Sequence, residues 1–127
     1  MSTLNIPTGH QTIMPYLMLE SSEKFIDFTT KVFDAIVKFK QMRDDTNVVM
    51  HAEIQINGST IMFCDRNEQW KLPAGSLFIY VEDADTTYQK AVSQGATTIM
   101  EPADQEYGRS CGVSDQSGNV WWITSVK

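Results

Sequence analysis

Hydrophobic and polar positions follow the same order twice along the chain. In the first half, an apolar segment at 14–19 precedes a segment at 22–33 whose apolar residues recur every three or four positions, as on one face of a helix. An alternating segment at 50–56 and an apolar return at 60–64 then predict two strands. The second half repeats this order, with strands predicted at 77–81, 97–100, 111–114 and 120–124 and a helix at 85–94.

Each half also contains a tight turn at the same place in this order. Asn57-Gly58 is a strong hairpin signal, because both residues tolerate the positive φ that such turns require. Ser117-Gly118 occupies the equivalent place, 60 residues later. The repetition predicts an α+β fold built from two βαβββ modules, at about 12–66 and 76–127. We expect a single domain at 1–127, because a chain of 127 residues is long enough for one core but not for two. Paired units of this kind usually enclose a pocket between their sheets.

Composition and charge narrow the class of protein. The net charge of −6 and the pI of 4.7 argue against nucleic-acid binding, which needs clustered basic residues. Lys38, Lys40 and Arg43 are the one local basic group, and we expect them to form a solvated edge. No apolar stretch is long enough to cross a membrane and no secretory signal is visible, so cytoplasmic localisation is the default expectation. Cys64 and Cys111 have no CxxC spacing, which favours two buried free thiols.

Short motifs distributed over nearly the whole chain carry a family resemblance. They are Pro15-Tyr16-Leu17, Phe25-Ile26-Asp27-Phe28, Met50-His51-Ala52-Glu53, Tyr80-Val81-Glu82-Asp83-Ala84-Asp85, Met100-Glu101-Pro102-Ala103-Asp104-Gln105 and Gly118-Asn119-Val120-Trp121-Trp122. In these motifs the chain resembles the vicinal oxygen chelate superfamily of glyoxalases, bleomycin resistance proteins and dioxygenases, and within it the PhnB-like branch. The resemblance implies the glyoxalase/bleomycin resistance-like fold, a cupped mixed sheet made of paired modules. The chemistry does not follow from the fold.

The resemblance also implies where a metal would lie in an enzyme of this superfamily. Such enzymes hold a divalent metal at the open face of the cupped sheet with His and Glu side chains, and use it as a Lewis acid. Aligned by the motifs, those positions hold Met14 or Pro15, Ser76 and Trp122 here, and only Glu53 lies about where a carboxylate is expected. One carboxylate and one serine are too few donors for zinc, nickel or iron. We therefore expect no cofactor.

A divalent metal bound by an atypical set, His51, Glu53 and Glu101, is the alternative. His51 and Glu53 project from the same face of the strand predicted at 50–56. His51 suits ligand contact or acid–base chemistry, and it equally suits a structural hydrogen bond to Glu53 or to a backbone carbonyl. His10 is the only other histidine, and we expect it to be an exposed residue of the N-terminal tail.

The segment around Glu101 and the tandem tryptophans supply the remaining candidates. Pro102 removes a backbone donor and is expected to end the preceding strand, which leaves Glu101 beside a loop at 103–109. Two roles are open for Tyr107 in that loop. It lines the mouth of the pocket with Glu101 and Arg109, or it packs over the sheet and only holds the loop in place. Trp121 and Trp122 are neighbours on a strand, so one faces the core and the other the cup.

These observations favour a protein that binds a small molecule in the cleft of its sheet without a standard metal site. The predicted ligand-binding residues are His51, Glu53, Glu101, Tyr107 and Trp122. No catalytic residue is assigned. The alternative is a metal-dependent lyase, isomerase or dioxygenase, so the sequence leaves open whether the protein is an enzyme. The expected partners are a small-molecule ligand and a second copy of the chain in a homodimer, with no nucleic acid and no membrane.

Overall fold

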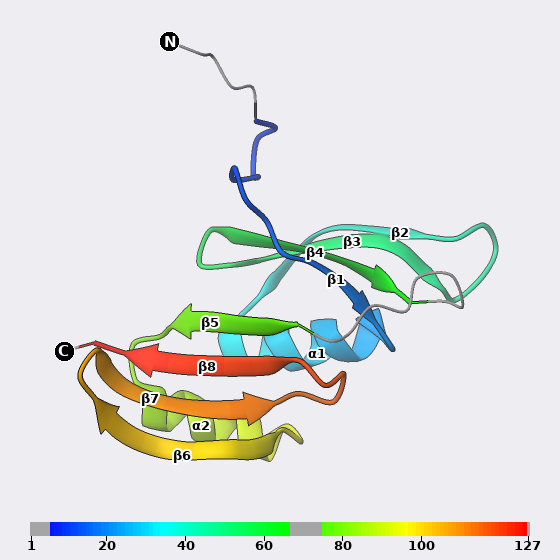
Figure 1. Cartoon of the computed structure of the whole chain (residues 1–127). Helices are drawn as coiled ribbons and strands as arrows, with labels where there is room; N and C mark the ends of the chain where they lie inside the picture. Colours follow the sequence, from blue (N-terminus) through cyan, green and yellow to red (C-terminus); the bar gives the residue numbers. More distant parts are fainter. Residues whose placement is uncertain (1–5, 67–74, 127) are drawn as a thin grey trace, which may run out of the picture.

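A computed structural model describes residues 6–66 and 75–126, which form two four-stranded mixed sheets, each with one helix (Figure 1). The first sheet has the order β1-β4-β3-β2, in which β1 and β4 run parallel and the other pairs antiparallel. Its elements are β1 (Tyr16–Leu19), α1 (Ser22–Phe33), β2 (Ile36–Met42), β3 (Val49–Ile56) and β4 (Ser59–Asp65).

The second sheet repeats this arrangement with the order β5-β8-β7-β6, in which β5 and β8 are parallel. The α+β fold and the repeat that the hydrophobic pattern predicts are therefore confirmed. Within the described residues, no helix has the length and apolar content to span a membrane. The elements of this half are β5 (Ser76–Tyr80), α2 (Ala84–Ser93), β6 (Thr97–Gln105), β7 (Gly108–Ser114) and β8 (Val120–Ser125).

Local sequence signals fix the ends of both helices. Ser21 Oγ accepts a hydrogen bond from the backbone N–H of Lys24 at 3.2 Å, and an Asp83 carboxylate oxygen accepts one from Thr86 at 3.2 Å. These side chains satisfy N–H groups that have no partner within the first turn. Gly95 follows α2 with a φ of +97°, a conformation that glycine adopts without steric cost.

The hydrophobic pattern predicts no strand at 36–42, yet β2 forms there at the edge of the first sheet. All seven of its residues are exposed. Its pairing with β3 is irregular between Val37 and Phe39 and again between Gln41 and Met42. Because neither face of β2 is buried and the register shifts twice, the regular alternation by which a strand is recognised is absent.

β6 extends beyond the predicted end at residue 100 and runs through Pro102 to Gln105. Its pairing with β7 skips from Met100 to Ala103, so Pro102 lies in a register irregularity of an edge strand. A proline at such a position sacrifices no hydrogen bond of the ladder. The expectation that Glu101 stands at a strand end beside a loop is therefore wrong, since Glu101 lies within β6.

The core joins the two halves through aromatic rings. The Trp121 side chain on β8 is 1% exposed, and its ring centroid lies 6.0 Å from that of Phe25 and 4.8 Å from that of Phe33, both on α1. Phe25 also contacts Phe63 of β4, with the ring centroids 4.9 Å apart. One helix of the first half thus packs against both sheets, and large aromatic side chains supply much of the buried apolar area.

A buried carboxylate holds the turn that leads into β8. Asp115 Oδ1 accepts backbone N–H groups of Ser117 and Asn119, each at 2.9 Å. Its Oδ2 accepts the Asn119 side-chain amide at 3.2 Å and Trp121 Nε1 at 2.8 Å. Asn119 Oδ1 in turn accepts the backbone N–H of Gly75 at 2.8 Å, which ties the start of the second half to the same turn.

We expect Asp115→Ala to lower the free energy of unfolding by about 2–4 kcal/mol, because it leaves the buried Trp121 and Asn119 donors without acceptors. Urea unfolding followed by circular dichroism measures this change. The control is Asp27→Ala, since Asp27 is exposed and pairs with Lys31 on the surface of α1. Its loss should change stability by about 0.5 kcal/mol or less. Equal effects of the two substitutions would contradict the role of the buried network.

Candidate functional site

The structure places the five sequence-predicted site residues on two different sheets. His51 and Glu53 lie on β3 of the first sheet. Glu101 lies on β6, Trp122 on β8, and Tyr107 in the turn between β6 and β7, all of the second sheet. Side chains on a strand alternate between faces, and α1 and α2 each cover one face. We call the uncovered faces the first-sheet face and the second-sheet face.

The first-sheet face carries a carboxylate held between two imidazoles. Glu53 Oε1 lies 2.7 Å from His10 Nε2, and Glu53 Oε2 lies 2.9 Å from His51 Nε2. The Glu53 side chain is only 15% exposed. Because an ionised carboxylate only accepts hydrogen bonds, both imidazoles carry a proton on Nε2. The structural role that the sequence leaves open for His51, a hydrogen bond to Glu53, is therefore present.

Two opposing effects set the pKa of Glu53. Burial by itself raises the pKa of this carboxyl group, whereas the hydrogen bonds from His10 and His51 and their electrostatic attraction lower it. The hydrogen bonds and the attraction together outweigh burial, so the pKa lies below its ordinary value. Glu53 is consequently a fixed negative charge on the first-sheet face at neutral pH.

The N-terminal segment lies against this face and is not an exposed tail. In addition to the contact of His10 with Glu53, the Gln55 amide donates to the Gly9 carbonyl at 3.0 Å. Gln11 donates to the Thr60 carbonyl at 2.8 Å and accepts from the Thr60 backbone N–H at 3.1 Å. The expectation for His10 is wrong because these contacts join residues more than 40 positions apart, which no local pattern of the sequence records.

The second-sheet face carries four aromatic side chains, which we call the aromatic face: Phe78, Tyr80, Tyr107 and Trp122. Phe78 is opposite Trp122 in the pairing of β5 with β8, and its ring centroid lies 5.1 Å from that of Tyr80 and 6.3 Å from that of Tyr107. Phe78, Tyr80 and Tyr107 are 52%, 68% and 54% exposed. Trp122 Nε1 donates to Ser76 Oγ at 3.2 Å, which fixes the indole on the sheet.

A glycine makes room for this indole. A Cβ atom placed on Gly112 of β7 would lie 2.5 Å from the six-membered ring of Trp122. Only glycine lets the ring lie so close to the backbone. Gly112, Phe78 and Tyr80 are not among the site residues that the sequence predicts. The signal for Phe78 and Tyr80 is present, because they alternate along β5 with Leu77 and Ile79, which are partly buried against the core.

Two further polar candidates do not join either group. Glu101 is exposed, and no hydrogen bond of its carboxylate occurs within the residues that the structure describes. Arg109 lies on β7 rather than in a loop, and donates to the two carboxylate oxygens of Asp85 at 3.0 and 3.1 Å and to Asp104 at 3.4 Å. The guanidinium of Arg109 lowers the pKa of Asp85. Arg109 is thus occupied by carboxylates of its own chain.

The residues present do not fit the divalent metal that the resemblance implies. Both oxygens of Glu53 accept imidazole protons, and Glu101 lies on the other sheet. Among residues 6–66 and 75–126, no group of three or more His, Cys, Asp or Glu side chains is arranged to hold a metal ion. The set His51, Glu53 and Glu101 is therefore not assembled in this chain, and a tight site needs three or four such donors.

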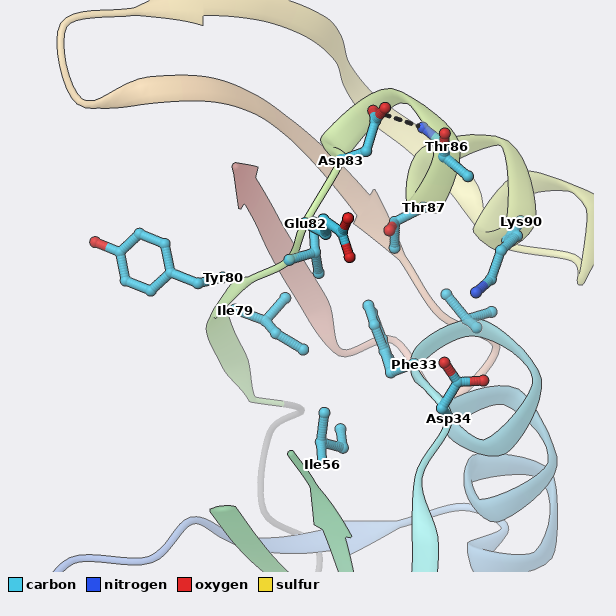
Figure 2. Close-up of a pocket in the computed structure, with 12 residues that line it drawn as sticks. Phe33, Asp34, Ile56, Ile79, Tyr80, Glu82, Asp83, Thr86, Thr87 and Lys90 are labelled. Carbon is cyan, nitrogen blue, oxygen red and sulfur yellow. Dashed lines mark hydrogen bonds between the residues drawn. The ribbon is translucent and has the colours of Figure 1, made fainter. Parts of the chain in front are cut away.

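A cavity of about 460 Å³ lies where the end of α1, the start of α2 and the ends of β3 and β5 meet (Figure 2). Of the five predicted site residues, none lines it. Figure 2 shows Glu82 and Lys90 pointing into the space between the two helices. The residues that line the cavity are Val32, Phe33, Asp34, Ile56, Ile79, Tyr80, Val81, Glu82, Asp83, Thr86, Thr87 and Lys90.

Comparison with known proteins establishes the family. Residues 13–123 match the profile of the Glyoxalase/Bleomycin resistance protein/Dioxygenase superfamily. The chain belongs to this superfamily. An uncharacterized protein of Mycobacterium bovis is 29% identical over 121 residues, which cover 86% of this chain and 79% of that protein. The family thus agrees with the motifs, while this relative carries no established activity.

Solved structures support the PhnB-like resemblance of this superfamily member. A PhnB protein from Bacillus cereus superimposes with a TM-score of 0.72 at 25% identity, covering 91% of this chain and 100% of that chain. TnmS3, an antibiotic binding protein from Streptomyces sp. CB03234, superimposes with a TM-score of 0.71 at 17% identity, covering 93% of this chain and 100% of that chain. At that identity the second likeness shows the shared fold alone.

The pKa of Glu53 generates a prediction on stability. Because this pKa is lowered on folding, the ionised form favours the folded state, and its contribution is complete above the ordinary value of 4.5. The contribution is lost as the pH falls through the lowered pKa. The stability difference between the wild type and Glu53→Gln should therefore be largest near neutral pH and shrink in acid below 4.5. Urea midpoints over a pH series measure it.

The control is Glu106→Gln, because Glu106 is an exposed carboxylate in the turn between β6 and β7. This substitution should leave the pH dependence of the urea midpoint as it is in the wild type. A stability gap for Glu53→Gln that stays constant from neutral to acidic pH would contradict the role assigned to the two imidazoles.

Proposed function

We propose that this protein binds a flat, largely apolar small molecule on its aromatic face and needs no metal to do so. The observation that supports the proposal is the grouping of Phe78, Tyr80, Tyr107 and Trp122 on one uncovered sheet face, three of them more than half exposed. Soluble proteins seldom leave contiguous apolar surface open to water unless a ligand or a partner covers it.

The geometry of this surface favours a planar ligand. The indole of Trp122 lies against the backbone at Gly112 and is held by Ser76, so it offers a ring of fixed orientation. Aromatic rings attract one another in offset or edge-to-face arrangements, beyond the effect of the area they bury. TnmS3, which shares the fold, is an antibiotic binding protein, which agrees with the binding of a small molecule. The net charge of −6 attracts cationic molecules and repels anions, so it favours a neutral or cationic ligand over an anionic one.

His51 and Glu53, the hydrogen-bonded ionisable pair of the predicted site, lie on the first-sheet face. A cavity of about 470 Å³ includes His10, Lys38 and Glu53 but no residue of the second sheet. We infer that a second copy of the chain brings the two faces together, the first-sheet face of one subunit opposite the aromatic face of the other. A symmetric pair would then contain two equivalent clefts. Glu53 would supply a negative charge at the polar end of each cleft.

Metal-dependent catalysis remains the second candidate, and the single observation that favours it is the hydrogen-bonded pair of His51 and Glu53 on an open sheet face. In a dimer, Glu101 of the other subunit would have to complete the set of donors. Metal analysis of protein purified without chelator tests this candidate. Stoichiometric metal that disappears in His51→Ala would replace the binding proposal with the catalytic one.

We expect Trp122→Ala to weaken the binding of doxorubicin, a planar cationic probe, by about tenfold or more, because the variant removes one stacking ring. Quenching of protein fluorescence or titration calorimetry measures the affinity. Trp122→Phe is the matched control, since it keeps an aromatic ring at this position and should stay within about threefold of the wild type. Undiminished affinity in Trp122→Ala, or no binding by the wild type of any planar member of a chemically diverse library, would contradict the proposal.

The shared cleft makes a separate prediction about mixtures of variants. His51→Ala and Trp122→Ala should each damage both clefts of a homodimer. A mixed dimer of the two variants contains one cleft with both substitutions and one cleft with neither, so mixing should restore binding to a fraction of the chains. Calorimetry of the mixture against the separate variants, with light scattering for the oligomeric state, measures this. A monomer, or no gain on mixing, would show that the cleft is not shared.

A further inference from the structure

Sulfur-bearing side chains from three strands line a further cavity, which opens beside β1, β4 and β3. Its volume is about 430 Å³. It shares no residue with the aromatic face, and it includes neither His51 nor Glu53. The lining residues are Tyr16, Met18, Arg43, Val49, Met50, Cys64 and Asp65.

The strand register explains why two of these sulfur atoms, those of Met18 and Cys64, meet. β1 runs parallel to β4, and their pairing sets Met18 directly opposite Cys64 on one face of the sheet. The distance from Cys64 Sγ to Met18 Sδ is 3.1 Å. Cys64 is 8% exposed and Met50 is 40% exposed. The thiol is therefore largely buried, whereas Met50, which also lines the cavity, is exposed to water.

We propose that Cys64, Met18 and Met50 form a binding site for Cu(I), a soft monovalent cation. Thiolate and thioether sulfur are the donors that this ion prefers, and three of them suffice because soft ions accept low coordination numbers. Methionine side chains are flexible and polarizable, so they can move apart to admit the ion. The site depends neither on a second subunit nor on the flat ligand proposed above.

The surroundings discriminate against harder cations. Asp65 is the only carboxylate among the lining residues, and its two oxygens accept the backbone N–H groups of Ser22 and Val49, each at 2.7 Å. These oxygens are therefore engaged in holding the fold. Magnesium and calcium bind oxygen donors, and a tight zinc site needs about four thiolate, imidazole or carboxylate donors, whereas this cavity offers one thiolate and no imidazole.

Binding requires the loss of one proton. The Cys64 thiol releases H⁺ as the Cu–S bond forms, and copper remains Cu(I), so no oxidant or reductant takes part. Burial raises the pKa of this thiol and Asp65 raises it further, whereas the Tyr16 hydroxyl and the Arg43 charge oppose the rise. Copper must compete with this proton, so the affinity for Cu(I) should increase with pH as long as the pH is below the pKa of the thiol.

Titration of the full-length, reduced protein with Cu(I) under anaerobic conditions tests the site, with bathocuproine disulfonate as the competing chelator. The wild type should bind one Cu(I) per chain and gain ultraviolet absorption from the copper–thiolate bond. Cys64→Ser should lose at least about 100-fold in affinity, because it removes the one anionic donor. The matched control is Cys111→Ser, since Cys111 is a fully buried thiol on β7 outside this cavity, and it should bind as the wild type does.

A second set of variants guards against misfolding of Cys64→Ser. Replacing methionine by leucine conserves volume and is usually well tolerated. Met18→Leu combined with Met50→Leu should keep the fold, checked by circular dichroism, and weaken Cu(I) binding by about tenfold or more. Wild-type binding no tighter than that of Cys64→Ser, an equal loss in Cys111→Ser, or an unaffected double methionine variant would overturn the proposal.

Discussion

The burial of the Trp121 indole between the two halves of the chain is the interaction on which the architecture depends. Its ring packs against Phe25 and Phe33 of α1, while its Nε1 donates to the buried Asp115. The ring contributes apolar area and the hydrogen bond removes the cost of burying its one polar atom. Asp115 also accepts hydrogen bonds from the backbone of the turn before β8. The same carboxylate therefore positions both the start of β8 and Trp121, the residue that joins the halves.

The two halves join through the sheet faces that the helices cover, and this determines which residues are left on the uncovered faces. The core uses Trp121 and the covered faces, so the alternate residues of the same strands lie on the uncovered faces. Trp122 is the clearest case, since its position next to Trp121 places its ring on the aromatic face. His51 and Glu53 project in the same way from a strand whose alternate residues, Ala52 and Ile54, are fully buried.

The sequence predicts a structural feature well when the residues that produce it lie close together in the chain. The repeat, the helix at 22–33 and the alternation of Ala52 and Ile54 with His51 and Glu53 are local patterns, and they are confirmed. β2 is not predicted because a strand exposed on both faces has no periodic signature. The strand predicted at 97–100 is too short because its proline lies at a register irregularity of β6 and does not end the strand.

The candidate site is predicted less completely than the fold. The sequence supplies the side chains but not which sheet carries them, and so Glu101 and Trp122 appear in one group with His51. Contacts over long separations in the chain are also missed, such as the approach of His10 to Glu53. Gly112 is overlooked for a related reason, because the need for a missing side chain is visible only when the indole of Trp122 lies beside it.

The irregular pairing of β2 has a consequence for how copies of this chain can meet. An edge strand has unpaired backbone N–H and C=O groups, with which a strand of another molecule can form hydrogen bonds and so extend the sheet. In β2, two register irregularities and the lysines at 38 and 40 hinder such pairing. Ile36 and Phe39 can therefore remain in contact with water without recruiting neighbours edge to edge. Edge-to-edge pairing of copies through β2 is therefore disfavoured.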